Sequence, residues 1–506
     1  MIKTASQYHD FTGYIRGKIA GHYLDWQNQP NVFKEYQGIE PIPLPEDIPP
    51  LKQNLLSLLK EEGADSASKR IDISDLALIL RLTCCLTAKV RSAGGDFYYR
   101  NTASAGALYP TEIYAATSGI KGIDDGLYHF EIHRQSLSTL RSGDFADHIS
   151  RFIFRPAGKS PHLVIIFSAI CFRSSWKYRD RAYRYHLLDT GHVIENLFFA
   201  MKALRLPLDV YYDFNDREIN RLIGVDDNRE VALAVAVVCG SGSVRDLEVP
   251  SIEKLPENLI SRSIVSGHEI DYPAINEIHR AGEMYEEKKD HSHEFPVSPS
   301  LIPKTWQRLQ DSFSSGQEIE YPRCLFMRRS SRNFVDAPIS SNKFFSLLDS
   351  LCLNYHPNPE NASIDSSMLS IGFIAENIED ITSGLYVLDT IKRRFEMVSS
   401  GSLTEMMSHV CLDQEWLKSA GIHFLFISNP GLLDRKYGPR GYRYAMMTAG
   451  RMGQRIYIAA ASLGLGCCGI GAFYDNEAAD LIGLSNDSRL LYLVAVGRVK
   501  RSPLIS

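Results

Sequence analysis

The stretch KYGPRGYRYAMMTAGRMGQRIYIAAASLGLGCCGIGAFYDNEAADLIGL, residues 436–484, occurs a second time in altered form over residues 177–225. The earlier copy reads KYRDRAYRYHLLDTGHVIENLFFAMKALRLPLDVYYDFNDREINRLIGV, and the two copies keep one register without a gap. The matching positions include Tyr178 and Tyr437, Gly191 and Gly450, Leu206 and Leu465, Phe214 and Phe473, and Gly224 and Gly483. Agreement over this length indicates a tandem repeat of one domain.

The repeat also sets the expected domain boundaries. A chain of 506 residues is too long for a single core, so two domains are predicted. We expect an N-terminal arm over residues 1–50, because its exit, EPIPLPEDIPP, is rich in helix-breaking proline. The first domain then covers residues 51–245 and the second residues 321–506. The charged stretch at 246–320, rich in Pro, Ser and His, is predicted to be a solvated, partly helical linker.

Composition narrows the classes of partner and site. The hydrophobic fraction of 44% and the net charge of −5 are those of a soluble globular protein, with no reason to expect nucleic acid or membrane as partner. The start of the chain, MIKTASQYHDF, lacks the apolar region of a signal peptide, so we expect a cytoplasmic protein. Nine cysteines without a C-x-x-C motif argue against a disulfide framework and a zinc site, and no metal site is predicted.

Two short motifs have the composition of ligand-binding segments. In RNTASAGALYPTEIY, residues 100–114, the small residues leave backbone N–H groups uncovered, which suits close approach by a flat or anionic ligand. A tight packing turn is the alternative. In MRRSSRNF, residues 327–334, three arginines and two serines have the donors needed for a phosphate. A basic surface turn is the alternative here.

These motifs, together with WKYRDRAYRYHLLDTGH (176–192), KYGPRGYRYA (436–445) and LGLGCCGIGAF (463–473), resemble the nitroreductase superfamily of flavin enzymes. More narrowly they resemble its SagB/ThcOx-type dehydrogenases, which oxidise thiazolines and oxazolines in ribosomal peptides. The resemblance covers nearly the whole chain except the linker. It implies an α+β fold of two tandem nitroreductase-like domains, each a mixed sheet flanked by helices. The two domains would form an intrachain pseudo-dimer with FMN at their interface.

The resemblance further implies a single composite FMN site. Domain two keeps the arginine motif, whereas EGADS (62–66) stands at the aligned place in domain one and cannot hold a phosphate. Bulky residues replace the Gly-x-Gly turn in domain one, and Ile364 replaces Gly106 in domain two. One FMN per chain is therefore expected. The expected cofactor-binding residues are Arg328, Arg329, Ser330, Arg332, Ser104, Ala105, Gly106, Ala107, Gly469, Ile470, Gly471, Lys500 and Arg501.

A Lys-Tyr pair is implicated in catalysis by the same resemblance, and each repeat carries one, Lys177–Tyr178 and Lys436–Tyr437. Free lysine and tyrosine have pKa values of about 10.4 and 10, so a base near neutral pH needs mutual tuning, and a neighbouring lysine favours the phenolate. The alternative, that the pair merely packs the central helix, must hold for at least one copy if there is one site. The sequence leaves open which pair faces the flavin.

The predicted function is dehydrogenation of thiazoline- or oxazoline-type rings in a peptide or carrier-bound substrate, by hydride transfer to FMN. Other peptide-modifying enzymes are candidate partners. Two alternatives stay open: a nitro- or quinone-reductase-like enzyme that uses NAD(P)H, and a non-catalytic scaffold subunit of a peptide-modifying complex.

Overall fold

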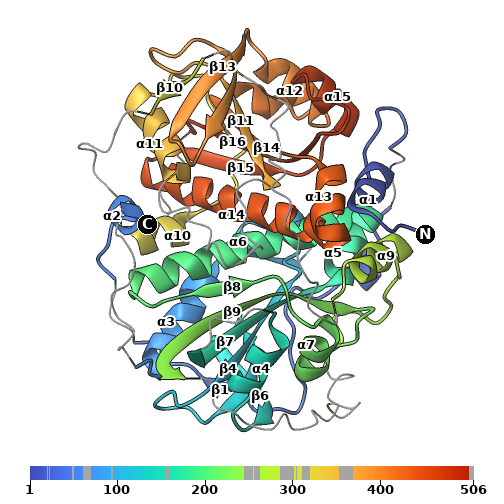
Figure 1. Cartoon of the computed structure of the whole chain (residues 1–506), viewed down its shortest axis with the longest axis vertical. Coiled ribbons are helices and arrows are strands. Elements are labelled where there is room, and N and C mark those ends of the chain that lie inside the picture. The colour runs from blue at the N-terminus through green and yellow to red at the C-terminus, as the bar shows by residue number, and fades with distance from the viewer. Residues whose placement is uncertain are drawn as a thin grey trace.

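The computed structural model describes residues 1–19, 21, 23–47, 51–60, 70–92, 95–154, 159–243, 255, 263–284, 301, 303, 305–309, 320–352 and 368–500. These residues form two domains that lie one above the other in Figure 1. Among the described residues, no helix is long and apolar enough to cross a membrane.

Each domain is built on a seven-stranded sheet. The strand orders are β1-β6-β5-β4-β7-β9-β8 and β10-β13-β12-β11-β14-β16-β15, which correspond position by position. The first sheet consists of β1 (Ile42–Pro43), β4 (Thr111–Thr117), β5 (Gly126–Glu131), β6 (Ser136–Ser142), β7 (Lys159–Ile170), β8 (Asp209–Tyr211) and β9 (Glu230–Ser243). The second consists of β10 (Gln307–Arg308), β11 (Ser370–Ala375), β12 (Gly384–Asp389), β13 (Arg394–Ser400), β14 (Ile422–Ser428), β15 (Gly466–Ile470) and β16 (Arg489–Gly497). The predicted α+β fold of two tandem domains is confirmed.

The ladders described within these two sheets are antiparallel. Short connections make β4, β5 and β6 a meander, whereas the long helical crossover joins β7 to β8, which are separated by β9. A parallel contact occurs at the edge of the second sheet, where Ser330 forms a bridge with Cys467 of β15. The arginine motif, residues 328–332, therefore runs beside the strand that leads into the Gly-x-Gly turn, residues 469–471.

Helices flank the sheets and fill the space between them. The first repeat contains α1 (Ala5–Phe11), α2 (Leu55–Lys60), α3 (Ile73–Thr83), α4 (Ala146–Phe152), α5 (Cys171–Tyr178), α6 (Ala182–Ala203) and α7 (Asp216–Ile223). The later part of the chain contains α9 (Pro273–Ala281), α10 (Tyr321–Met327), α11 (Ser341–Cys352), α12 (Thr404–Val410), α13 (Pro430–Tyr437), α14 (Gly441–Ser462) and α15 (Asp475–Leu481).

Helices α6 and α14 lie side by side between the two sheets, as Figure 1 shows. They cross where the repeat has glycine in both copies. A Cβ on Gly191 would lie 2.2 Å from the carbonyl oxygen of Met447, and a Cβ on Gly450 would lie 2.2 Å from that of Leu188. Backbone-to-backbone contact at this point explains why both copies keep glycine.

Buried ion pairs cross the same interface. Glu195 of α6 accepts hydrogen bonds from Arg451 and Arg455 of α14, and all three side chains are buried. At the N-terminal end of α6, Arg181 and Arg184 both contact Asp475. At the neighbouring N-terminal end of α14, Arg440 and Arg443 make the equivalent contacts with Asp216. The intrachain pseudo-dimer is therefore held by ion pairs that repeat with its internal symmetry.

The N-terminal arm and the linker also contain equivalent elements. Strand β1 of the arm pairs with β6, and β10 of the linker pairs with β13 at the same place in the second sheet. Arg184 donates to the backbone carbonyl of His9 in α1, and Arg443 donates to that of His279 in α9. Helix α9 buries Ala274, Ile275, Ile278 and His279. The described residues within 246–320 thus belong in part to the second repeat, and are not only a solvated connection.

Candidate active site

A cavity of about 590 Å³ lies between the two domains, and most of the predicted site residues line it. The first domain contributes Ser104 to Ala107 of the small-residue turn together with Lys177 and Tyr178. The second domain contributes Arg328, Ser330, Arg332 and residues 469–471. The two halves that the sequence places far apart therefore meet at one pocket. Its remaining lining residues are Phe97, Tyr99, Thr102, Ala103, Tyr109, Tyr185, Leu188, Asp189, His192, Gln414, Trp416, Tyr457, Cys468, Ala472 and Tyr492.

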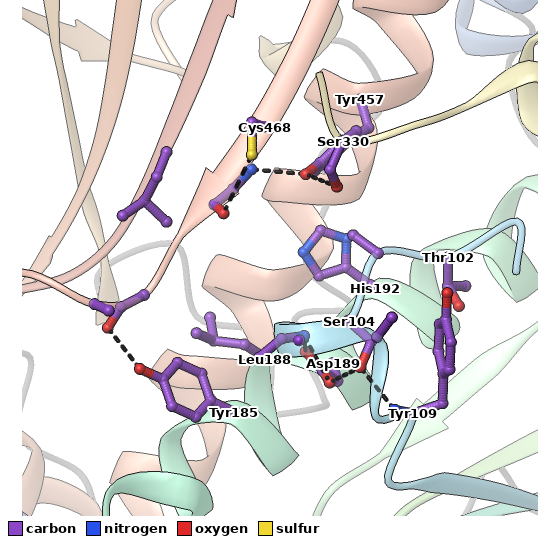
Figure 2. A pocket seen from close by; sticks show the side chains of 18 of the residues that line it. Thr102, Ser104, Tyr109, Tyr185, Leu188, Asp189, His192, Ser330, Tyr457 and Cys468 are labelled. Carbon is purple, nitrogen blue, oxygen red and sulfur yellow. Dashed lines mark hydrogen bonds between the residues drawn. The ribbon is translucent and has the colours of Figure 1, made fainter. Parts of the chain in front are cut away.

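The small-residue turn has an unusual backbone. Gly106, Ala107 and Tyr109 have φ angles of 64°, 55° and 48°, in the left-handed region that favours glycine. The buried carboxylate of Asp189 in α6 holds the turn, because it accepts hydrogen bonds from Ser104 Oγ at 2.6 Å and from the Ala105 N–H at 3.2 Å (Figure 2). Ser104 Oγ in turn accepts from the Tyr109 N–H at 2.8 Å.

The sequence analysis did not identify Asp189. The equivalent position in the second repeat is Thr448, so the carboxylate is present in only one of the two copies, and that difference could have marked it. Burial raises the pKa of Asp189 to about 7, while the hydrogen bonds from Ser104 and Ala105 oppose that rise. A carboxyl group that titrates near neutral pH thus anchors one wall of the pocket.

Lys177 and Tyr178 are the last two residues of helix α5, and their side chains approach Gly106 of this turn. A Cβ on Gly106 would lie 2.8 Å from the Tyr178 hydroxyl and 3.4 Å from Lys177 Nζ. The indole N–H of the preceding Trp176 donates to the backbone carbonyl of Asp25 in the N-terminal arm, at 2.8 Å. The arm therefore helps to fix the end of α5.

The electrostatics of the pair differ from the expectation of a tyrosinate. Burial, followed by the neighbouring Tyr185 and Asp189, raises the pKa of Tyr178 above its ordinary value. Burial, followed by the positive charge of Arg332, lowers the pKa of Lys177. The Tyr178 phenol is thus held neutral. The amine of Lys177, in contrast, loses its proton at a lower pH than a free lysine and becomes the available base.

Arg328 reaches across the interface into the first domain. Its Nε and Nη2 donate to the backbone carbonyls of Asn101, Arg100 and Thr102, at distances between 2.8 and 3.2 Å. Its Nη1 is buried and has no hydrogen-bond partner among the described residues. A buried charged donor without an acceptor is costly, so an acceptor atom of a ligand in the pocket would stabilise it.

Ser330 and the Gly-x-Gly turn are joined through Tyr457 of α14. The Gly469 N–H donates to the Tyr457 hydroxyl at 2.6 Å, and that hydroxyl lies 2.8 Å from Ser330 Oγ (Figure 2). A Cβ on Gly469 would lie 1.8 Å from the Tyr492 hydroxyl, and one on Gly471 would lie 2.6 Å from the Tyr185 ring. Packing of the protein's own tyrosines therefore already requires glycine at both positions, in addition to any need of a cofactor.

His192 and Tyr492 also line the pocket and were not anticipated. His192 Nδ1 lies 2.8 Å from Gln454 Oε1, which can only accept, so Nδ1 carries the proton. The Tyr492 hydroxyl then donates to His192 Nε2 at 3.0 Å. Burial lowers the pKa of His192 to about 4, so this imidazole is neutral at physiological pH.

Several predicted site residues lie elsewhere. Arg329 does not line the cavity but donates to Thr87 of the first domain, and Lys500 contacts Asn333 through its backbone. Lys436 and Tyr437 end α13 at the pseudo-symmetric position and are absent from the pocket lining. The structure therefore does not place Arg329, Lys436, Tyr437 and Lys500 in the lining of this pocket, and their part in the site stays a prediction. Arg501, Ile364 and residues 62–66 lie outside the described residues.

At the position equivalent to the pocket in the other half of the interface, two tyrosine side chains pack against each other. Tyr212, which aligns with Gly471, stacks on Tyr444 with ring centroids 6.0 Å apart. The Tyr444 hydroxyl donates to Asp213 of the same segment. Where the pocket has the Gly-x-Gly turn, the equivalent segment of the first domain is therefore filled by tyrosine side chains of the protein.

Comparison with known proteins is consistent with this duplicated architecture. A model described as the nitroreductase family matches residues 67–241 and again residues 325–498. The chain belongs to the nitroreductase family. Proteins of this family are generally flavin-dependent oxidoreductases, so the chain is placed among the flavoenzymes of the superfamily that its motifs resemble.

Individual relatives support both the duplication and the family. A crystal structure from Anabaena variabilis, described as that of a candidate nitroreductase, aligns with a TM-score of 0.79 and 25% identity over 99% of this chain and 100% of its own. A candidate nitroreductase of Methanocaldococcus jannaschii, MJ1384, is 27% identical over 188 residues, which are 36% of this chain and 92% of that protein. The trifolitoxin-processing protein TfxB of Rhizobium leguminosarum bv. trifolii is 25% identical over 175 residues. The match spans 33% of this chain and 47% of TfxB, about half its length.

Proposed function

We propose that the chain binds one FMN in the interdomain pocket and dehydrogenates thiazoline- or oxazoline-type rings of a peptide or carrier-bound substrate. The observation that carries the proposal is the convergence of complementary motifs from both domains on one cavity. The similarity to TfxB, whose name records the processing of trifolitoxin, supports a peptide as the substrate.

The residues of the pocket fit FMN. Arg328 and Arg332 have the charge and fork geometry that a phosphate or a flavin carbonyl requires, and Arg328 Nη1 lacks a partner among the described residues. Ser330 and the segment 469–471 line the pocket beside them, and the Ser330 hydroxyl is a compact donor. The turn at 104–107 would close the site from the first domain. Bound there, FMN would supply the two-electron acceptor that the dehydrogenation needs.

Lys177 is the proposed general base. Oxidising an azoline to an azole removes a hydride from one ring carbon and a proton from its neighbour, and it leaves a new C=C bond. The lowered pKa of Lys177 increases the fraction of neutral amine that can accept the proton. Tyr178, kept as a phenol, can donate a hydrogen bond to the substrate and orient its ring.

The test combines cofactor content with a pair of matched variants. The purified chain is expected to release one FMN per polypeptide and to convert 2-phenylthiazoline-4-carboxamide into the thiazole, with a mass loss of two hydrogens. Lys177→Met should lower the rate by about 10² to 10⁴-fold while FMN content is kept. Lys436→Met removes the equivalent lysine of the other repeat and should leave the rate unchanged.

Other outcomes would redirect the assignment. Two FMN per chain would contradict the single composite site. Turnover of menadione with NADH but not of the thiazoline would favour a quinone reductase. Bound FMN that neither substrate reduces would favour a scaffold subunit, and equal losses in both lysine variants would remove Lys177 from its proposed role.

A further inference from the structure

Arg329 makes contacts that the cofactor site does not explain. It stands between Arg328 and Ser330 of the pocket, yet its guanidinium turns to a separate two-stranded sheet of the first domain. This hairpin consists of β2 (Leu86–Ser92) and β3 (Gly95–Arg100). Arg329 Nη1 donates to Thr87 Oγ1 at 3.0 Å and Nη2 to the Thr87 carbonyl at 3.4 Å, while the guanidinium lies 5.4 Å from the centre of the Tyr99 ring.

The same hairpin supplies an aromatic wall to the cavity. Phe97 and Tyr99 of β3 both line it, and their rings meet edge to face with centroids 5.0 Å apart. Phe97 keeps 40% of its surface exposed, which places its ring at the rim of the pocket. From the second domain, Trp416 lines the cavity as well, with Arg332 5.8 Å from its ring centre. Aromatic rings therefore reach the cavity from both domains.

The base of the hairpin, where Leu86 pairs with Arg100, is held from both domains. The Tyr109 hydroxyl accepts from the Arg100 N–H at 3.1 Å and donates to the Tyr98 carbonyl at 3.3 Å, so β3 is tied to the small-residue turn. Strand β2 is tied to the second domain through Thr87 and Arg329. A two-stranded sheet alone is only marginally stable in water, so such contacts determine where its side chains stand.

We propose that Arg329 is a positioning residue that holds the β2–β3 hairpin against the second domain, so that Phe97 and Tyr99 recognise a flat ring of the substrate. Exposed aromatic rings gain most from another flat ring, by stacking or edge contact. The inference rests on the proposed function for the nature of that ring. It extends that function by separating recognition at the rim from cofactor binding deeper in the pocket.

The experiment measures binding and cofactor content separately. Calorimetry on the full chain as purified would use the flat probe 2-phenylthiazole-4-carboxamide and the puckered probe 2-cyclohexylthiazolidine-4-carboxamide. Phe97→Ala and Arg329→Ala are each expected to weaken the flat probe about three- to tenfold, with little change for the puckered one. FMN per chain should stay at the wild-type value. Arg323→Ala, which removes an exposed arginine of α10, is the matched control.

A structural readout distinguishes positioning from contact. Amide hydrogen exchange over residues 86–100 should become faster in Arg329→Ala and stay unchanged in Phe97→Ala. Arg329→Lys keeps the charge but loses the fork, so its exchange should resemble that of Arg329→Ala.

Three results would overturn the inference. Loss of FMN in Arg329→Ala would make Arg329 a cofactor ligand. Equal affinity of Phe97→Ala and Arg323→Ala for the flat probe would remove the aromatic wall from recognition. Unchanged exchange in Arg329→Ala would remove the positioning role. If the wild-type chain carries no FMN, the proposed function fails, but calorimetry on the flavin-free chain still tests the rim.

Discussion

Replacing Gly106 by alanine tests the geometry of the proposed catalytic pair most directly. Gly106 has a φ of +64°, and an added Cβ would lie 2.8 Å from the Tyr178 hydroxyl and 3.4 Å from Lys177 Nζ. Ordinary contact for such a Cβ begins at 3.4 Å, so the Tyr178 hydroxyl must retreat by roughly half an ångström. Since a misplacement of about 1 Å can cost on the order of 100-fold in rate, we expect about a tenfold loss.

Gly119 provides the matched control. Its φ is +65°, but a Cβ there would meet no atom within 4 Å. Gly119→Ala and Gly106→Ala should therefore share the cost of alanine in the left-handed region, about 1 to 2 kcal/mol in the free energy of unfolding. Only Gly106→Ala should slow the reaction.

The assay is anaerobic stopped-flow reduction of the bound flavin by 2-phenylthiazoline-4-carboxamide, combined with urea unfolding of both variants. A lower rate in Gly106→Ala with wild-type FMN content is the expected result. If both variants react at the wild-type rate, the contact between the turn and the Lys177–Tyr178 pair has no role in the chemistry. If both are equally slow, backbone strain rather than displacement of Tyr178 is the cause.

Three further predictions concern charge. The rate of flavin reduction should rise with pH and level off below the ordinary lysine pKa of about 10.4, because the neutral amine of Lys177 is the base; a profile that falls with pH would contradict this. The pKa of Asp189 is about 7 in the folded protein and about 3.9 in a free side chain. Between these values the folded state retains a proton that the unfolded chain releases. The free energy of unfolding should therefore fall by up to about 4 kcal/mol as pH rises from about 4 to about 7. Asp189→Asn should flatten that dependence in urea unfolding, and an unchanged slope would assign it to other groups. Glu195→Ala leaves Arg451 and Arg455 buried without their shared carboxylate and should cost about 3 to 5 kcal/mol in thermal unfolding, whereas a loss below about 1 kcal/mol would show that water or other groups replace it.

The arm and the linker show where sequence comparison stopped short. Helices α1 and α9 occupy equivalent places, yet the segments around them share little beyond His9 and His279. Their contacts to Arg184 and Arg443 are made through backbone carbonyl groups, which place no constraint on the side chains. Two segments that are equivalent only through backbone contacts need not have similar amino-acid sequences, so a sequence comparison does not detect them.

The sequence by itself determined the duplication, because close packing at positions such as Gly191 and Gly450 restricts both copies to one residue type. Its motifs, through their resemblance to a known family, predicted the α+β class and the separation of site motifs between two halves of the chain. Local composition also marked the small-residue turn and the arginine motif as candidate ligand-binding segments, with a packing turn and a basic surface turn as the alternatives.

Only the tertiary structure decided which of the repeated residues face the pocket. Lys177 and Lys436 are equivalent in sequence, but the small-residue turn approaches only the first among the described residues. Arg328 and Arg329 are neighbours, but one guanidinium lines the cavity and the other holds the β2–β3 hairpin. The raised pKa of Asp189 arises from burial between the domains. Side-chain direction and burial are properties of contacts between distant segments, so a pattern of residue types along the chain could not fix them.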